Sequence, residues 1–311
     1  MRRRKNISLI TIIFIMIAFI YGTFSSEINK TFGLTENSSN NNIEVNNNNL
    51  ESRKDVDGEL NVYFLDVGQA DSILIEANGE YMVIDGGNNS DGELLVKYFK
   101  SLGIDRFKYI VGTHPHEDHI GGLDDIIDSF NIGTIYLPDA ITTTATFEDL
   151  LDSMENKNLT YDVPEINSTF TLGDATLKVI YTGTDTSDLN NTSIVLKLVY
   201  GNNSFLFTGD ATSETEEKII NQDIAADVLK VGHHGSKYST TNNFLDKVNP
   251  KYAIISVGEN NIYNHPASST IDKLKKRNIS IYRTDIDGTI LAQSDGDNIS
   301  FSKLKTNTNG G

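Results

Sequence analysis

The chain contains no cysteine, which excludes disulfide bonds, thiolate metal ligands, a cysteine nucleophile and a lipid anchor on cysteine. Tryptophan is absent as well, but 14 Phe, 13 Tyr and a hydrophobic fraction of 38% are ample for a substantial core in 311 residues. Histidine is scarce, with 6 in the whole chain. The places where these few histidines gather are therefore informative.

The N-terminal residues have the composition of an export signal. Basic residues from Arg2 to Lys5 precede an apolar run from Ile7 to Ile20. A helix over this run would be about 21 Å long, short of the roughly 30 Å hydrocarbon core of a bilayer. We predict that residues 1–26 are a signal peptide cut after Ser25, or a membrane anchor if left uncleaved. Either outcome places the protein outside the cell or on the outer face of its membrane.

The chain divides into a polar spacer and a folded part. Residues 27–58 are rich in asparagine and lack periodicity, which predicts a disordered linker and leaves residues 59–311 as one domain. The first 58 residues hold 7 Lys+Arg and 6 Asp+Glu, so residues 59–311 carry a net charge of −18. Such a field weakens association with nucleic acid unless a local patch or bound cations reverse it, although most acidic surfaces serve only solubility.

Short apolar runs alternate with amphipathic segments throughout the folded part. The first series predicts strands in NVYFLDV, DSILIEA, YMVIDGG, FKYIVGT and TIYLP, with a hairpin at Asn78-Gly79 and helices over 92–102, 123–130 and 146–155. The second series begins near Thr169 and again places strands before helices, with a further hairpin predicted at Asp287-Gly288. Two mixed sheets with helices on their outer faces would form a four-layer αββα sandwich.

Half of the histidines lie in the stretch T-H-P-H-E-D-H, residues 113–119. His114 and His116 are two positions apart, so on an extended segment both rings point the same way. Asp118 and His119 follow as the chain turns into a helix. The pattern predicts two adjacent metal ions, one held by each pair. A merely polar turn is disfavoured, because crowded imidazoles without a metal repel one another when protonated.

Other candidate ligands end separate strands of the second series. SFLFTGD ends on Asp210, which could bridge both ions, and DVLKVGHHGS ends on His233 and His234, with Ser236 in the turn that follows. An aspartate before a turn is commonly only a turn residue. The shared position of these residues at strand ends is what indicates a single site.

Several further residues are candidates to support the site. Asp85 ends YMVIDGG, and we expect its carboxylate to fix the tautomer of a histidine. Gln69 and Asp71 in DVGQAD form either a loop over the metals or a plain connecting turn. Arg283 could reach a phosphate, although a surface ion pair is the more ordinary role for it.

Eight segments occur in order between Leu60 and Ile290: FLDVGQADSILIE, DGG, THPHEDHIGG, NNTSIVL, FLFTGDA, LKVGHHGS, NIYNHP and RTDIDG. With them the chain resembles the metallo-β-lactamase fold superfamily. More narrowly, it resembles the hydrolase domain at the C-terminus of ComEC-like competence (DNA-internalisation) proteins and their free-standing relatives. The resemblance implies the αββα fold, with two divalent metal ions bound between the two sheets.

The resemblance also implies which side chains bind metal, namely His114, His116, Asp118, His119 and Asp210. One of His233 and His234 matches the last ligand, and the other would face the substrate phosphate or solvent. His265 in NIYNHP would be an ordinary loop residue by itself. Its match to the family motif implies instead that it contacts the phosphate or protonates the leaving oxygen, so that Asp118 and His265 form the catalytic pair.

The chain departs from the broader superfamily at one ligand. No histidine lies between His119 and His233, where that superfamily usually supplies a third imidazole to the first metal. Asn190 and Asn191 stand there instead, so that Asn191 is a candidate second-layer or substrate contact. Fewer nitrogen ligands and more oxygen ligands make Mn²⁺ as plausible as Zn²⁺.

We expect an exported metal-dependent phosphodiesterase or nuclease that uses metal-bound hydroxide at a dinuclear site. Its substrate would be DNA or a cell-envelope polymer, with no obligate protein partner. An alternative is a phosphodiesterase of teichoic-acid phosphocholine type, since a cationic choline group suits an acidic surface. A non-catalytic metal-binding accessory of DNA uptake is another alternative, whereas β-lactam hydrolysis is disfavoured by the missing histidine.

Overall fold

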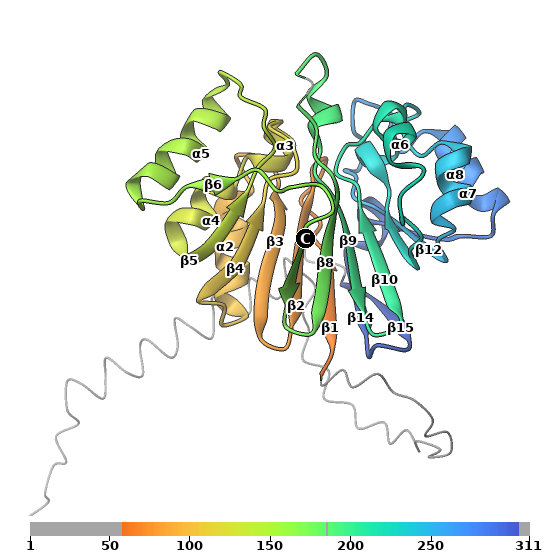
Figure 1. The fold of residues 1–311 in the computed structure, drawn as a ribbon, viewed down its shortest axis with the longest axis horizontal. Coiled ribbons are helices and arrows are strands. Elements are labelled where there is room, and N and C mark those ends of the chain that lie inside the picture. Colours follow the sequence, from red (N-terminus) through yellow and green to blue (C-terminus); the bar gives the residue numbers. More distant parts are fainter. Residues whose placement is uncertain (1–57, 185, 305–311) are drawn as a thin grey trace, which may run out of the picture.

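The computed structural model describes residues 58–184 and 186–304. The predicted leader, residues 1–26, and the predicted linker, except for its last residue, lie outside these ranges. Within the described ranges, no helix has the length and apolar character needed to cross a membrane. Two mixed sheets pack against each other and helices cover both outer faces (Figure 1). The predicted αββα sandwich is therefore confirmed.

The first sheet has eight strands in the order β15-β14-β1-β2-β3-β4-β5-β6. Strands β3, β4, β5 and β6 run parallel to one another, and the other pairs are antiparallel. The strands span Leu60–Phe64 (β1), Ser72–Ala77 (β2), Glu80–Gly86 (β3), Arg106–Val111 (β4), Asn131–Tyr136 (β5), Tyr161–Asp162 (β6), Thr289–Ser294 (β14) and Ile299–Leu304 (β15).

The second sheet has seven strands in the order β13-β12-β11-β10-β9-β8-β7. Strands β10 to β13 are parallel, whereas β7 to β10 form an antiparallel meander. The strands span Thr169–Leu172 (β7), Ala175–Tyr181 (β8), Val195–Tyr200 (β9), Asn203–Phe207 (β10), Val228–Lys230 (β11), Tyr252–Ile255 (β12) and Ser280–Arg283 (β13).

Helices cover each sheet on the side away from its partner (Figure 1). The first sheet is covered by α2 (Gly92–Ser101), α4 (Leu123–Ser129) and α5 (Ala145–Asn156). The second is covered by α6 (Ser213–Ile219), α7 (Asn242–Val248) and α8 (Ser268–Lys276). Short helical turns lie in loops: α3 (Glu117–Ile120), η1 (Leu189–Thr192), η2 (Gly232–Gly235) and α9 (Thr284–Asp287).

Three apolar clusters hold these layers together. Each helix layer packs on its sheet, as Leu95 and Leu150 do on the first and Phe244 does on the second. The central cluster lies between the sheets and includes Phe64 and Phe207, whose ring centroids are 6.3 Å apart. Burial of these apolar surfaces stabilises the sandwich and fixes the two sheets relative to each other. The loops at one edge of the sandwich are consequently held on a rigid frame.

The hairpin predicted at Asn78-Gly79 is present. It joins β2 to β3, and φ is positive at both residues, 51° for Asn78 and 76° for Gly79. A two-residue turn with positive φ at both positions has the twist of a β-hairpin.

The hairpin predicted at Asp287-Gly288 is wrong. The strand before it, β13, belongs to the second sheet, and the strand after it, β14, belongs to the first. The intervening residues form α9, where the Asp287 carboxylate accepts a hydrogen bond from the Arg283 backbone N–H at 3.0 Å. The aspartate therefore stabilises a helical turn at a crossing between sheets. β14 and β15 thus complete the first sheet and do not extend the second series.

Candidate metal centre

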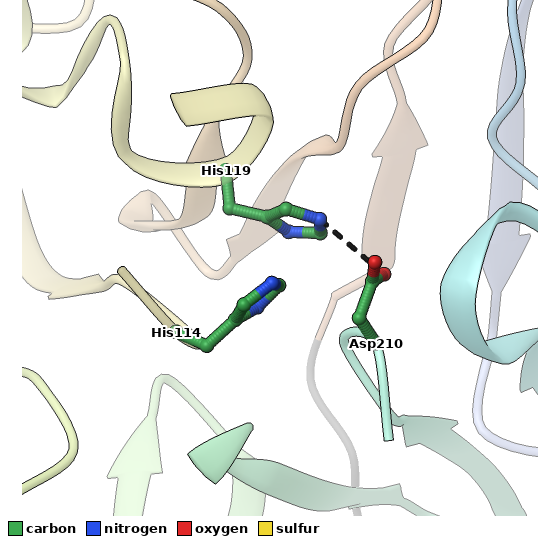
Figure 2. A group of neighbouring side chains, drawn as sticks. All are labelled: His114, His119 and Asp210. Atoms are coloured by element: carbon green, nitrogen blue, oxygen red, sulfur yellow. Dashed lines mark ion pairs between the residues drawn. The ribbon is translucent and has the colours of Figure 1, made fainter. Parts of the chain in front are cut away.

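The loops that follow four strands meet at one edge of the sandwich. The first sheet contributes Asp85 at the end of β3 and the 113–119 segment after β4. The second contributes Asp210 after β10 and the His233–His234 pair after β11. His119 Nε2 lies 3.3 Å from Asp210 Oδ1, so side chains from the two sheets are in direct contact (Figure 2). The strand-end residues singled out in the sequence are brought together.

A glycine allows this close approach. Gly209 precedes Asp210 and has a φ of 49°, a backbone angle that residues with a Cβ rarely adopt. A Cβ placed there would lie 3.0 Å from Oγ1 of Thr113, which comes from the other sheet. The Asp210 backbone N–H donates to Ser193 Oγ at 3.1 Å, which further fixes the turn. The segment T-G-D therefore positions the Asp210 carboxylate between the sheets.

The 113–119 segment converges on a common centre, but not as an extended strand. The backbone bends, with the His116 N–H donating to the His114 carbonyl at 3.0 Å, and His116 then precedes α3. His114 Nε2 and His116 Nδ1 lie 3.0 Å apart. The two imidazoles predicted to share an ion therefore meet, although a bend and not the alternation of a strand brings them together.

Three overlapping groups of side chains in the described residues could hold a metal ion, and in one of them, Asp71, Asp85 and His119, both carboxylates face Nδ1 of His119. His114, His119 and Asp210 are buried and offer ligand atoms within 4.8 Å of one another (Figure 2). The ligand atoms of Asp118, His119 and His234 lie equally close together and form a second group. His119 belongs to both of these groups, and Asp210 Oδ2 lies 3.7 Å from His234 Nε2. These two groups differ from the predicted pairs, because His119 joins His114 in one of them and His116 belongs to neither.

Unpaired buried atoms test whether a cation fits here. Nε2 of His119, Nε2 of His234 and Oδ1 of Asp210 are buried, yet form no hydrogen bond with any part of the chain that the structure describes. Buried polar atoms are normally paired, because leaving them unpaired costs about 1–3 kcal/mol each. Imidazole nitrogen and carboxylate oxygen that point into one space are the donor set of zinc and manganese sites. The residues present therefore fit divalent cations.

Asp85 lies behind His119, on the side away from this space. Its Oδ2 is 2.8 Å from His119 Nδ1, and its Oδ1 accepts from the Thr113 backbone N–H at 2.7 Å. With Nδ1–H held by Asp85, the Nε2 atom of His119 is directed to the centre, which is the orienting role predicted for Asp85.

The electrostatics of the centre follow from burial among opposite charges. Burial raises the pKa of Asp85, and the nearby His119 only partly offsets this. For His119, burial lowers the pKa, but Asp210 and Asp85 outweigh it and raise the pKa well above its ordinary value. The carboxylates therefore hold positive charge strongly at this position, as they would hold that of a cation.

His234 and His233 occupy different positions at the centre. His234 is buried, and its Nδ1–H donates to the Ser256 carbonyl at 3.0 Å, which leaves Nε2 facing Asp118 Oδ2 at 3.3 Å. The His233 side chain is 24% exposed, with Nε2 3.7 Å from Asp210 Oδ2. Their φ angles of 51° and 52° turn both rings towards the pocket. The anchored tautomer of His234 favours it as the ligand and leaves His233 on the open side.

Alanine variants of the two histidines should separate these roles. We expect His234→Ala to lose about one bound ion per chain, because its anchored Nε2 completes a ligand group. His233→Ala should keep its metal and lose turnover only. Metal analysis of the dialysed proteins measures this, and equal metal loss in both variants, or loss in His233→Ala alone, would reverse the assignment.

Asp71 lies beneath the centre, not over it. It is buried, and its Oδ2 pairs with Lys230 Nζ at 2.6 Å, while its Oδ1 lies 3.4 Å from His234 Nδ1. The expectation of a covering loop is therefore corrected for Asp71. Gln69, in contrast, does line the pocket, and its Oε1 accepts from the Gly258 N–H at 3.1 Å.

Lys230 is a buried residue next to the centre that the sequence did not point to. It ends β11 with a fully buried side chain, which joins Asp71 from the first sheet to the strand that leads to His233 and His234. A charged residue inside the otherwise apolar run V-L-K-V is the signal that could have identified it, since buried lysines require a partner.

Asn191, predicted as a second-layer or substrate contact, does not line the pocket. Its Oδ1 accepts from Thr212 Oγ1 at 2.5 Å and from Thr215 Oγ1 at 3.1 Å, and its Nδ2 donates to Glu214. The amide is therefore held by side chains at the start of α6, where Thr212 is the N-cap. Asn190 lines the pocket in its place.

Ser236 and His265 are the remaining predicted residues. Ser236 is buried, accepts a hydrogen bond from the Tyr238 N–H at 3.3 Å and lines a neighbouring groove, not the metal pocket itself. His265 lines both, with its ring centroid 5.5 Å from that of His233. Burial and the neighbouring His233 and His234 lower the pKa of His265 to about 4.

Arg283 pairs with Asp285 at 2.5 Å, which is the ordinary role foreseen for it.

A pocket of about 290 Å³ opens over the centre. Its lining joins the proposed ligands His116, Asp118, Asp210 and His234 to His265 and Tyr263. A small substrate group can therefore reach the ligand atoms directly from solvent.

A two-sheet sandwich with imidazole and carboxylate groups at one edge defines a class of metal-binding hydrolase folds. Residues 65–259 match the family described as the Metallo-beta-lactamase superfamily. The chain belongs to this superfamily, which is one of metal-dependent hydrolases.

Competence proteins are among its relatives. The chain is 30% identical over 255 residues to ComE operon protein 3 of Bacillus subtilis, an alignment that covers 75% of this chain and 33% of that protein. It is 28% identical over 238 residues to competence protein ComA of Neisseria gonorrhoeae, covering 75% of this chain and 32% of the relative. The chain thus spans about a third of the length of these relatives.

A solved structure shares the fold. CmlA, a diiron beta-hydroxylase from Streptomyces venezuelae, superposes with a TM-score of 0.50 at 16% identity, covering 73% of this chain and 53% of that one. At this level of identity the likeness concerns the fold alone.

Proposed function

We propose that the protein is an exported phosphodiesterase that uses two divalent cations and acts on nucleic acid. The observation that carries the proposal is the pair of ligand groups that share His119, with Asp210 between them. Neighbouring cations a few ångströms apart are used for displacement at phosphate esters. The competence proteins among the relatives favour DNA as the polymer.

The side chains divide into three roles in this proposal. One cation would be held by His114, His116 and Asp210, and the other by Asp118, His119 and His234. When bound, Zn²⁺ or Mn²⁺ would lower the pKa of water and offset the charge of the phosphodiester. Asp85 orients His119 from behind, and Lys230 holds Asp71 next to Nδ1 of His234.

His265 contributes at the mouth of the pocket. Its Nδ1 atom is buried and has no hydrogen-bond partner within residues 58–184 and 186–304. With a pKa of about 4 the ring is neutral at pH 7, because burial and two neighbouring histidines disfavour its charged form. It is therefore suited to a hydrogen bond with a phosphate or leaving oxygen, and less suited to bind the phosphate as a positively charged imidazolium.

A phosphodiesterase of phosphocholine-bearing envelope polymers is a second candidate. The exposed Glu117 carboxylate and the Tyr263 ring line the same pocket, and an acid beside an aromatic face suits a quaternary ammonium group. The net charge of −17 also favours a cationic substrate group over DNA.

A substrate panel separates the candidates. The full chain, loaded with Mn²⁺ or Zn²⁺, is assayed on single-stranded DNA, a choline phosphodiester reporter, bis(p-nitrophenyl) phosphate and a β-lactam. We expect hydrolysis of DNA and of the nitrophenyl diester, and none of the β-lactam. Protein with full metal occupancy that hydrolyses no phosphodiester would overturn the proposal in favour of a metal-binding accessory, and hydrolysis of the choline ester alone would favour the second candidate.

A further inference from the structure

A second groove opens beside the metal pocket. Its volume is about 620 Å³, within the range of ligand-binding cavities, and it shares His233, Tyr263 and His265 with the metal pocket. It continues along the 236–238 turn to the start of α8. A polymeric substrate whose scissile phosphate lies at the metal centre would therefore extend directly into this groove.

The lining of the groove is unusual for so acidic a chain. Its ten lining residues include no aspartate or glutamate, and Lys237 supplies a positive charge at the surface. Ser268 and Ser269 also line it. Two of the three acidic residues of the metal pocket, Asp118 and Asp210, are by contrast potential cation ligands, and the third is Glu117. The groove thus offers an anionic polymer a path free of carboxylates next to the cations.

Two exposed tyrosines line this groove. Tyr238 is 63% exposed and Tyr263 is 61% exposed. Among the described residues, no other aromatic side chain is as exposed to solvent as these two. The Tyr263 ring lies nearly parallel to that of His265, with centroids 5.8 Å apart. Exposed ring faces are the usual platforms on which proteins stack unpaired bases.

The position of Lys237 distinguishes between possible occupants. Its Nζ lies 4.9 Å from the centroid of the Tyr238 ring. A lysine already over that ring disfavours a quaternary ammonium group there, because the two positive charges would repel. A base on the ring, with its phosphate near the lysine, has no such conflict.

We infer that this groove binds the nucleotides next to the scissile phosphate of a single-stranded nucleic acid, with bases stacked on Tyr238 and Tyr263 and a phosphate near Lys237. The inference rests on the proposed phosphodiesterase function and narrows its substrate. In a duplex, paired and stacked bases cannot reach the two rings, so single strands should be preferred.

The test compares two main substrates on the metal-loaded full chain: a single-stranded DNA decamer and bis(p-nitrophenyl) phosphate, which is too small to fill the groove. The same decamer as a duplex and the choline phosphodiester reporter are assayed beside them. Tyr238→Ala should lower the ratio of kcat/KM for the decamer to that for the small diester by about 10-fold or more, since stacking supplies affinity only to the decamer. Tyr238→Phe should restore the ratio. Lys237→Gln should lower the magnitude of the slope of log(kcat/KM) for the decamer against log[salt] by about 1, the value of one phosphate contact.

Ile141→Ala serves as the matched control, because Ile141 is 72% exposed and lines neither cavity. It should keep the wild-type ratio. A wild-type ratio in Tyr238→Ala, or cleavage of duplex as fast as of single strand, would overturn the inference alone. A selective loss of choline-reporter hydrolysis in Tyr238→Ala would also overturn it. Wild-type protein inactive on both substrates would overturn the proposed function together with it.

Discussion

Asp210→Ala is expected to lose most of its bound metal and more than about 100-fold of its phosphodiester turnover. Changes to residues that merely orient metal ligands typically cost 10–100-fold, and Asp210 contacts the ligand groups themselves. Its carboxylate lies 3.3 Å from His119 Nε2 and 3.7 Å from Nε2 of both His233 and His234. Without it, the buried imidazoles from the two sheets would keep only the Asp118 carboxylate between them.

The measurement pairs metal content with hydrolysis of bis(p-nitrophenyl) phosphate. Asp246→Ala is the matched control, because the Asp246 side chain is 66% exposed, pairs with Arg277 and belongs to none of the ligand groups. That variant should keep both metal and turnover. An Asp210→Ala protein that retains two ions and wild-type turnover would exclude Asp210 from the centre.

Lys230→Met is expected to lower the free energy of unfolding by about 3–5 kcal/mol, the usual cost of removing one partner from a buried ion pair. The side chains of Lys230 and Asp71 are 1% and 2% exposed, and their charged atoms are 2.6 Å apart. Methionine matches the length of lysine but leaves the Asp71 carboxylate buried without its partner. Urea unfolding of wild type and variant measures the loss.

A second substitution distinguishes charge from packing. Adding Asp71→Asn to Lys230→Met removes the unpaired charge, so the double variant should be more stable than the single one. Lys218→Met is the control, since the Lys218–Glu214 pair is 42% and 54% exposed and such pairs contribute about 0–1 kcal/mol. Equal effects of Lys218→Met and Lys230→Met would contradict a structural role for the buried pair.

Much of the fold follows from local patterns. Apolar runs bounded by turn residues predict the strands, and Asn78-Gly79 predicts its hairpin because both residues tolerate positive φ. Asp287-Gly288 has the same kind of signal but forms a helical turn. The sheet to which β14 returns depends on packing across the whole sandwich, and no local pattern in the sequence records that choice.

The sequence predicts those parts of the candidate site whose residues are close in sequence or lie at the ends of predicted strands. The 113–119 cluster and the strand-end residues Asp85 and Asp210 meet as expected. Lys230 could not be placed in the same way, because its role depends on a partner 159 positions away in the other sheet. Similarly, the exchange of Asn191 for Asn190 at the pocket depends on which amide α6 engages.

The most direct test of the central proposal is anomalous diffraction from crystals of the full chain soaked in Mn²⁺. Two peaks are expected, one among His114, His116 and Asp210 and the other among Asp118, His119 and His234, at a separation of about 3.5–4 Å. The absence of any peak between these side chains at high manganese concentration, with ions found only on the acidic surface, would contradict it.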